Sequence, residues 1–313
     1  MKVLITGITG MIGSQVARLA TSQGCETFGF ARFSAASRMA AIQEKNILRC
    51  DILDRDALER IVEKIQPDLV VHMAAQAYNG ISWEMEDITH LTNYTGTLNV
   101  LKACRRLVPK AKVVLACSSA AYGDVLPADN PLKEARLLKP ITPYGVSKAA
   151  TEALGYQYYK NYGLAVFLPR LFIHVGTGHP PATAIQNFAR QLALITRRMA
   201  PPIIKVGNLS SARDFVDVRD GARALLLLAQ KGAPGDPINI CTSTTYTIRQ
   251  ILEMLIEISG QKVEVVADAQ LMRPSDEPLL LGDNTKLKAL GWQPEYSIQQ
   301  TLETVYQDWL SRI

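Results

Sequence analysis

The sequence predicts a doubly wound, parallel α/β sheet with a smaller, mixed α/β lobe, and three observations lead to this class. The chain has 313 residues, 48% hydrophobic and 20% charged, which suits one large folded domain or two modest ones. In its first half, short runs that are apolar throughout alternate with helical patterns, as in a parallel sheet covered on both faces. After about Gly176 the alternation becomes irregular. We therefore expect a first domain over residues 1–175 and a second lobe over 176–313, with a soft boundary that later segments cross to return to the first domain.

The expected elements follow in order along the chain. Apolar runs predict the strands of the first domain at Lys2–Thr6, Thr27–Ala31, Ile47–Cys50, Leu69–His72, Lys112–Ala116 and Ala165–Leu168. The segments between them predict helices at Ile12–Ser22, Asp54–Ile65, Leu91–Arg106 and Tyr144–Tyr162. In the second lobe we expect helices near Ile185–Arg198, Thr247–Ser259 and Ile298–Leu310, and a strand at Ile203–Val206. The first domain thus reads as strands joined by crossover helices.

Composition and charge exclude several classes of protein. The 34 Lys and Arg residues outnumber the 29 Asp and Glu residues, but they form no basic run with interleaved aromatics, so we expect no nucleic-acid partner. No uncharged apolar run approaches the ~18 residues of a membrane span. Glycines interrupt the first apolar stretch, which argues against a signal peptide. Five cysteines without a CxxC pair indicate reduced thiols and a cytoplasmic protein, and four histidines at no metal-ligand spacing indicate no metal.

Three glycines follow the first predicted strand. Gly7, Gly10 and Gly13 form TGxxGxxG between that strand and the first predicted helix. Glycines at these places permit a tight turn and let the backbone approach a pyrophosphate at the helix N-terminus. In this context the motif predicts a dinucleotide-binding domain of the Rossmann type.

The residues after the second predicted strand indicate which dinucleotide binds. NAD-specific sites place an acidic residue there, but no Asp or Glu occurs between Glu26 and Glu44. Arg32 and Arg38 occur instead, and a guanidinium suits a 2′-phosphate. The sequence therefore favours NADP(H), with NAD(H) as the alternative. Asp51, after the third strand, is expected near the adenine.

A second motif carries groups suited to proton transfer. Tyr144 and Lys148 form YxxxK near the start of a predicted helix, so both side chains project from one face. A lysine ammonium there favours the phenolate and is expected to lower the tyrosine pKa from about 10. Ser118 or Ser119, at the carboxyl end of a strand, could hydrogen-bond the oxygen that is reduced or oxidised.

Together these motifs resemble the extended short-chain dehydrogenase/reductase family, and within it the enzymes that modify nucleotide sugars. The matching segments span nearly the whole chain: TGITGMIG, Asp51-Ile52, HMAAQ, NYTGT, CSSAAYG, TPYGVSK and PRLF. Two later blocks, IKVGNLSSARDFVDVRD and RPSDEPLLLGDNTKLKALGW, look most like GDP-mannose 4,6-dehydratases and GDP-4-keto-6-deoxy-mannose reductases. The resemblance implies a nucleotide-sugar-binding second lobe. It also implies a homodimer paired through the helices at 91–106 and 144–162.

The resemblance implies roles for individual residues. Ser118, Tyr144 and Lys148 would form the catalytic triad. Cofactor contacts are implied at Gly7, Gly10, Met11, Ile12, Gly13, Arg32, Asp51, Ile52, Ala74, Ala75, Gln76, Asn93, Tyr144, Lys148 and Phe172. Substrate contacts are implied at Ser119, Arg190, Val206, Arg213 and Arg273, the last two matching arginines that grip the diphosphate and nucleotide. His174 and His179 fall near the mouth of the expected cleft.

Departures from the family pattern narrow the expected reaction. Family dehydratases carry a carboxylate two residues before the tyrosine of the YG pair, and 3,5-epimerase-reductases carry a cysteine, whereas this chain has Ala120. The usual asparagine after RLF is Ile173 here. We therefore expect reduction at C4, with GDP-4-keto-6-deoxy-mannose as substrate, NADPH as hydride donor and Tyr144 as proton donor. The alternatives are a nucleotide-sugar 4-epimerase or 4,6-dehydratase with tightly bound NAD(P), and, outside the enzymes, a cofactor-sensing regulator.

Overall fold

A parallel β-sheet forms the centre of the first domain. The structure is a computed structural model that describes residues 1–32, 46–272 and 277–313. In these ranges the sheet has the strand order β11-β7-β5-β4-β1-β2-β3, with β6 also paired to β7, and each neighbouring pair is parallel. The strands are β1 (Lys2–Thr6), β2 (Glu26–Ala31), β3 (Ile47–Arg49), β4 (Leu69–His72), β5 (Lys112–Leu115), β6 (Cys117–Ser118), β7 (Ala165–Leu171) and β11 (Pro237–Ile240).

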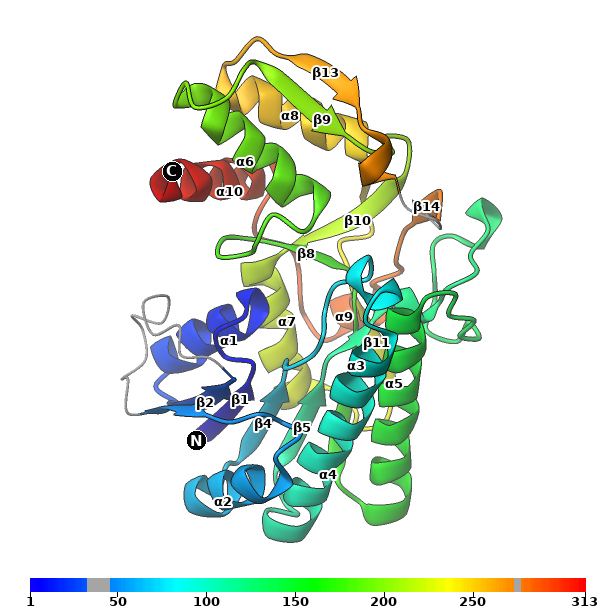
Figure 1. The fold of residues 1–313 in the computed structure, drawn as a ribbon. Helices are drawn as coiled ribbons and strands as arrows, with labels where there is room; N and C mark the ends of the chain where they lie inside the picture. Colours follow the sequence, from blue (N-terminus) through cyan, green and yellow to red (C-terminus); the bar gives the residue numbers. More distant parts are fainter. Residues whose placement is uncertain (33–45, 273–276) are drawn as a thin grey trace.

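Helices cover both faces of this sheet (Figure 1). One face packs against α1 (Met11–Ser22), α7 (Val218–Lys231) and α9 (Thr285–Ala289). The other packs against α2 (Arg55–Ile65), α4 (Gly96–Leu107) and α5 (Pro143–Tyr162). A short helix α3 (Glu86–His90) and a π-helical turn (Leu91–Thr95) lead directly into α4. This is the predicted doubly wound Rossmann arrangement, and the prediction of fold class is confirmed.

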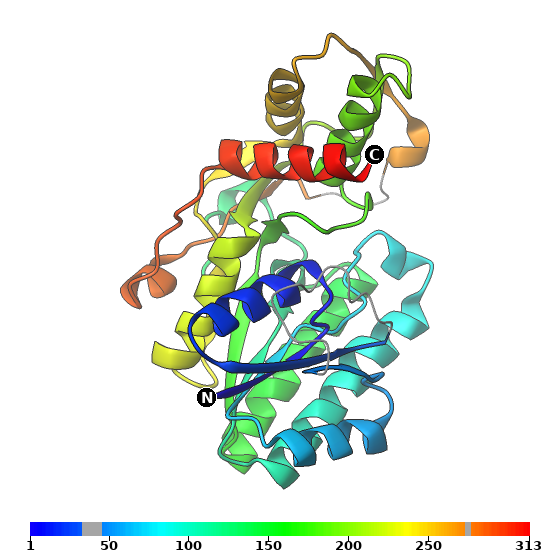
Figure 2. The ribbon, with the colours of Figure 1, turned by 90° about the vertical axis from the view of Figure 1, so that its left-hand side faces the viewer.

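The second lobe lies beyond the carboxyl ends of the strands (Figures 1 and 2). Its strand β10 (Ala212–Asp217) pairs with β8 (Ile173–Val175), β12 (Thr245–Thr247) and β14 (Leu279–Leu280). A separate parallel pair consists of β9 (Ile203–Val206) and β13 (Glu264–Ala267). Three helices share one apolar core: α6 (Ala184–Thr196), α8 (Ile248–Ser259) and α10 (Ile298–Arg312). Single 3-10 turns occur at Ile81–Trp83, Ser119–Ala121, Pro127–Asp129 and Ala269–Leu271.

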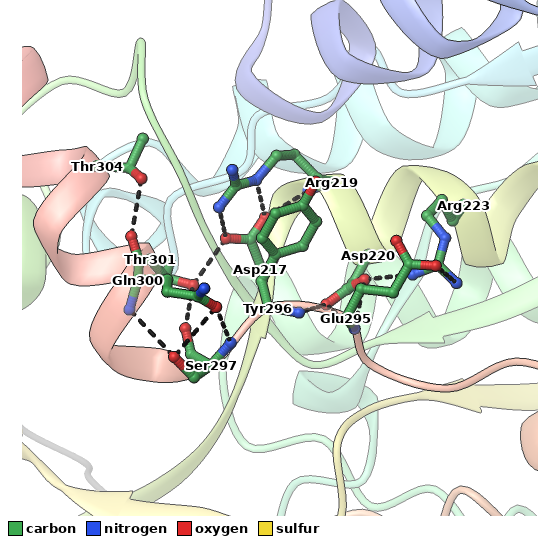
Figure 3. A network of polar contacts seen from close by, with 10 residues as sticks. All are labelled: Asp217, Arg219, Asp220, Arg223, Glu295, Tyr296, Ser297, Gln300, Thr301 and Thr304. Carbon is green, nitrogen blue, oxygen red and sulfur yellow. Dashed lines mark hydrogen bonds and ion pairs between the residues drawn. The ribbon is translucent and has the colours of Figure 1, made fainter.

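The chain crosses between the two parts more than once. After β8 and β10 in the second lobe, α7 and β11 lie in the first domain, and the chain then returns through β12 and α8. A polar network holds the junction (Figure 3). Asp217, the N-cap of α7, accepts two hydrogen bonds from the Arg219 guanidinium and one from the Thr301 hydroxyl on α10. The first helix after the crossing is therefore tied to the last helix of the chain.

Candidate active site

The glycine turn after β1 has the close packing that the sequence predicts. Gly7 has φ +65°, and a Cβ there would lie 2.8 Å from the backbone nitrogen of Ala74. A Cβ on Gly13 would lie 2.4 Å from the carbonyl oxygen of Gly7. The turn leads into α1, which has no acidic residue in its first turn. A tight, uncharged turn at the positive end of a helix dipole fits the pyrophosphate of a dinucleotide.

The segment after β4 borders this turn and is held by Asn93. The backbone N–H of Gln76 donates to Asn93 Oδ1 at 2.8 Å, and Asn93 Nδ2 donates to the carbonyl of Gln76 at 3.0 Å. Asn93 also donates to Ser147 on α5 at 2.8 Å, and it lies inside the π-helical turn, a feature frequent at functional sites. In this structure Asn93 positions the segment containing Ala74, Ala75 and Gln76.

The structure describes only some of the residues that are expected to bind the adenosine half of the dinucleotide. Arg32 follows β2 directly and is exposed. The carboxylate of Asp51 accepts the N–H of Leu53 at 2.9 Å, while Ile52 is buried against the helix at Gly96. Arg38 lies outside the described residues.

The catalytic candidates meet at the start of α5. Thr142 caps this helix by accepting the N–H of Gly145 at 3.0 Å, and Pro143 occupies its first position. Tyr144 hydrogen-bonds to Ser118 at the end of β6. Lys148, one turn further along, donates from Nζ to the carbonyl of Ala116 at 2.8 Å and lies 5.8 Å from the Tyr144 ring centroid. The structure thus brings Ser118, Tyr144 and Lys148 together.

Burial controls the protonation of this set. It raises the pKa of Tyr144 to about 12, although the hydrogen bond from Ser118 acts in the opposite direction. It lowers the pKa of Lys148 to about 8. The expectation of a lowered pKa for Tyr144 is therefore wrong for this arrangement, because desolvation of the phenolate outweighs the opposing hydrogen bond with Ser118. At neutral pH the tyrosine is a proton donor and the lysine is charged.

Ser82 is a residue of this site that the sequence analysis missed. It is fully buried, and its hydroxyl accepts the backbone N–H of Tyr144 at 3.2 Å while donating to the carbonyl of Asn79 at 2.6 Å. It satisfies one of the free N–H groups in the first turn of α5. A serine in an irregular segment carries no local signal of this contact.

Two buried carboxylates near the site are already paired. Glu152 binds Arg170 with oxygen–nitrogen distances of 2.8 and 2.6 Å, and Glu134 accepts the N–H of Asn239 at 2.9 Å. Ala120 follows Ser119 in a 3-10 turn. Both carboxylates thus have partners within the fold, and position 120 itself carries no acid.

The predicted substrate residues divide between two regions. Ser119 is buried beside Ser118. Phe172, which is predicted to contact the cofactor and not the substrate, is buried in an apolar cluster with Tyr122. Val206 lines a cavity of about 440 Å³ in the second lobe together with Asn208, Arg249 and Met272. Sequence reasoning had not singled out Arg249.

The structure describes two of the three predicted substrate arginines, Arg213 and Arg190. Arg213 is buried on β10, 3.6 Å from the carboxylate of Glu277. Arg190 is exposed on α6 and is not among the residues that line the cavity. Arg273 lies outside the described residues. Their contacts with a substrate stay predictions.

The histidines have structural partners in the described residues. His72 contacts the hydroxyls of Thr6 and Thr97 at 2.7 and 3.0 Å, and burial lowers its pKa to about 3. His174 donates from Nδ1 to the carbonyl of Phe172, and burial lowers its pKa to about 4. Its Nε2 is packed against Gly221. Both side chains are neutral at pH 7.

A doubly wound sheet with a glycine turn after β1 is a dinucleotide-binding fold, and the Ser–Tyr–Lys set at its carboxyl edge is the one that the resemblance to the extended short-chain dehydrogenases/reductases implies. The family model described as GDP-mannose 4,6 dehydratase matches residues 4–305. The chain therefore belongs to the family that this model describes, a family of extended short-chain dehydrogenases/reductases.

Named relatives and solved structures agree with this family. A GDP-6-deoxy-D-mannose reductase from Pseudomonas aeruginosa is 33% identical, covering 85% of this chain and 87% of the relative. A GDP-mannose 4,6-dehydratase from Vibrio cholerae is 28% identical, covering 98% and 93%. Among structures, RMD from Pseudomonas aeruginosa complexed with NADPH has a TM-score of 0.88 at 29% identity, covering 100% and 99%. A UDP-glucose 4-epimerase from Thermus thermophilus in complex with NAD has a TM-score of 0.89 at 27% identity, covering 100% of both chains.

Among the residues that the structure describes, no helix is both long and apolar enough to cross a membrane.

Proposed function

We propose that this enzyme reduces the C4 ketone of a nucleotide-linked 4-keto-6-deoxy sugar with NADPH, and that GDP-4-keto-6-deoxy-mannose is its substrate. The observation that carries the proposal is the assembled set of Ser118, Tyr144 and Lys148 next to Ala120. Reduction at C4 needs one hydride and one proton, both of which this arrangement accommodates. Water elimination needs a further acid, which the chain lacks at that position. The 33% identity with a GDP-6-deoxy-D-mannose reductase supports the same reaction.

The side chains of the site divide the work of proton transfer. The Ser118 hydroxyl would donate a hydrogen bond to the ketone oxygen and orient it. The Tyr144 phenol, protonated at neutral pH because its pKa is about 12, would donate a proton to the oxygen as it becomes an alkoxide. The charged Lys148 would favour the phenolate that remains. Bound NADPH would supply the hydride, so ketone, NADPH and one proton give alcohol and NADP⁺.

The choice of NADPH rests on the residues after β2. Arg32 is exposed where the adenosine ribose is expected, and the stretch from Thr27 to Gln43 contains no acidic side chain. A guanidinium can pair with the 2′-phosphate, whereas a ribose without that phosphate would find no carboxylate acceptor there. The structure of RMD complexed with NADPH supports this choice, while the NAD complex of the 4-epimerase supports the alternative.

The second lobe would hold the nucleotide end of the substrate. The cavity at Val206 is large enough for a nucleobase, and Arg213 and Arg273 are proposed to contact the diphosphate. Ser119 and Arg190 are proposed to contact the sugar and nucleotide.

We further propose that the enzyme is a cytoplasmic homodimer. Exposed apolar side chains gather on α3, the π-helical turn and the first turns of α5: Ile88, Leu91, Tyr94 and Val146. A face of this kind is covered by a partner in a homodimer more often than it is left in water. The five cysteines are all free thiols, as suits a reducing compartment.

A 4-epimerase is the second candidate, favoured by the structural similarity to UDP-glucose 4-epimerase. It would use the same three residues with a cofactor that stays bound. A 4,6-dehydratase, the activity named by the family model, would need an acid other than the residue at position 120.

The test is turnover of GDP-4-keto-6-deoxy-mannose with NADPH, followed by the loss of NADPH absorbance and by identification of the sugar. Stoichiometric oxidation of NADPH with a 6-deoxy sugar product supports the proposal. No oxidation, together with NAD(P) that co-purifies and interconversion of C4 epimers, would establish the epimerase instead. A dTDP-linked 4-keto sugar assayed in parallel tests whether the second lobe selects the guanine nucleotide.

A further inference from the structure

Two aromatic side chains from the two parts of the molecule meet beside the dinucleotide site. Tyr78 lies in the segment after β4, and His179 lies between β8 and α6. Their ring centroids are 5.4 Å apart with an interplanar angle of 65°, which is an edge-to-face contact. Aromatic pairs in this geometry attract each other beyond the area that they bury. The two rings therefore form a noncovalent link between the first domain and the second lobe.

Each ring is held firmly on its own side. The Gln76 side chain makes two hydrogen bonds to the backbone of Tyr78. Gln76 Nε2 donates to the Tyr78 carbonyl at 3.1 Å, and Gln76 Oε1 accepts the Tyr78 N–H at 2.5 Å. On the other side, Asp308 of α10 accepts the N–H of Gly178 at 3.1 Å. His179 Nδ1 lies 3.1 Å from the carbonyl of the next residue. Both rings are thus presented by anchored backbone.

The two segments that carry these rings also touch the glycine turn. The packing of Gly7 against Ala74 joins the turn to the segment after β4. The Cα of Gly176 faces the Met11 side chain at the start of α1, since a Cβ built on this glycine would lie 3.7 Å from Met11 Sδ. Figures 1 and 2 both show this segment above the beginning of α1. The two segments that carry the rings therefore lie next to the glycine turn, where a pyrophosphate is expected.

We propose that Tyr78 and His179 are cofactor-retaining residues, whose ring contact closes the protein around the bound dinucleotide and must separate before the dinucleotide leaves. The Tyr78–His179 contact joins the two segments through side chains alone, so it can part by a movement of two side chains. The proposal rests on the dinucleotide site of the proposed function, but not on the sugar. In a reductase the oxidised cofactor leaves in every cycle, so the opening of this contact would contribute to turnover.

The test measures dissociation of NADPH directly. Protein loaded with NADPH is mixed rapidly with excess NADP⁺, and the loss of bound-NADPH fluorescence gives the dissociation rate constant. We expect Tyr78→Ala and His179→Ala each to raise this rate constant about five-fold, which corresponds to about 1 kcal/mol at 1.4 kcal/mol per tenfold. The double variant should release NADPH no faster than either single variant, because all three lack the same contact.

Two further variants separate the ring contact from other effects. Tyr78→Phe keeps the ring and should release NADPH at the wild-type rate. Tyr296→Ala removes a different ring contact at the lobe junction, the one with Arg219, and should also leave the rate unchanged (Figure 3). Unchanged rates in both alanine variants, or additive effects in the double variant, would overturn the proposal. The readout needs no sugar, so a protein that fails to reduce the ketone still decides whether the ring pair retains NADPH.

Discussion

At the scale of single residues, the chemistry of the site follows from how deeply each group is buried. The sequence places Tyr144 and Lys148 one helical turn apart, but their pKa values depend on burial and on the neighbouring residues of β6. Burial makes the Tyr144 phenol a weaker acid, and the Lys148 ammonium a stronger acid, than in water. The raised pKa of Tyr144 suits reduction, which uses a protonated tyrosine.

Replacement of Tyr144 by Phe should lower kcat for the ketone by about 10²–10⁴-fold, the usual contribution of a positioned general acid. The hydroxyl alone is removed, so NADPH should bind to the variant as it does to the wild type. Steady-state turnover and an NADPH fluorescence titration measure the two effects. Tyr156→Phe, an exposed tyrosine on the same helix, is the matched control. Full turnover by Tyr144→Phe would contradict the assigned role.

The rate of reduction should fall as the pH rises through about 8. Lys148 carries its charge below its lowered pKa and loses it above, while Tyr144 stays protonated across this range. A pH profile of kcat measures the fall. Lys148→Arg keeps a positive charge, so its remaining activity should show no decline near pH 8. A wild-type profile that stays flat well above pH 8 would show that the charge on Lys148 does not contribute.

At the scale of elements, the sequence predicted best where one local pattern decided the structure. The helix at α2 begins after the N-cap Asp54 and ends at Ile65, as its apolar spacing predicts. The predicted helix at 91–106 instead begins earlier, at Glu86, and contains the π-helical turn around Asn93. Within that turn, Asn93 donates hydrogen bonds to Gln76 after β4 and to Ser147 on α5. These bonds connect residues that are far apart in the chain.

Helix α7 shows the limit of local patterns. The sequence predicts no helix at this place, yet α7 is a 14-residue helix that crosses back to cover the first domain. Its partners, α1 and the strands of the central sheet, come from the other end of the sequence. Its N-cap Asp217 accepts the N–H of Arg219 locally, and it also accepts a hydrogen bond from Thr301 of α10, a contact between distant residues that no local pattern predicts.

Replacement of Thr301 by Val should lower the free energy of unfolding by about 1–2 kcal/mol, because Asp217 loses a hydrogen bond to a buried carboxylate oxygen. Urea denaturation measures the change. Thr304→Val is the control, since its exposed hydroxyl donates only to the carbonyl of Gln300 (Figure 3). Equal stability of the two variants would mean that the junction network does not stabilise the fold.

At the scale of the whole molecule, the proposed active site belongs to neither part alone. The first domain contains the glycine turn and the Ser–Tyr–Lys set, and the second lobe contains the cavity at Val206, where we propose that the nucleotide binds. The proposed dimer face lies on helices that also carry Tyr144, so assembly and catalysis share a scaffold.

Replacement of Leu91 by Glu should convert the proposed dimer to a monomer, because a charge would be buried in an apolar interface. Size-exclusion chromatography with light scattering measures the mass. Leu137→Glu, at a more exposed position outside the α3–α5 face, should leave the mass unchanged. Equal masses for the wild type and Leu91→Glu would contradict this interface.

The sequence by itself determined the order of strands and helices in the first domain, the glycine turn and the presence of Ser118, Tyr144 and Lys148. Those features depend on apolar periodicity and on residue types at short spacing, which are local properties. Only the tertiary structure decided the high pKa of Tyr144, the support that Ser82 gives it, the return of α7 and β11 to the first domain, and the meeting of Tyr78 with His179. Each of these depends on burial or on contacts between distant residues, and a linear pattern carries no information about which distant segments will pack together.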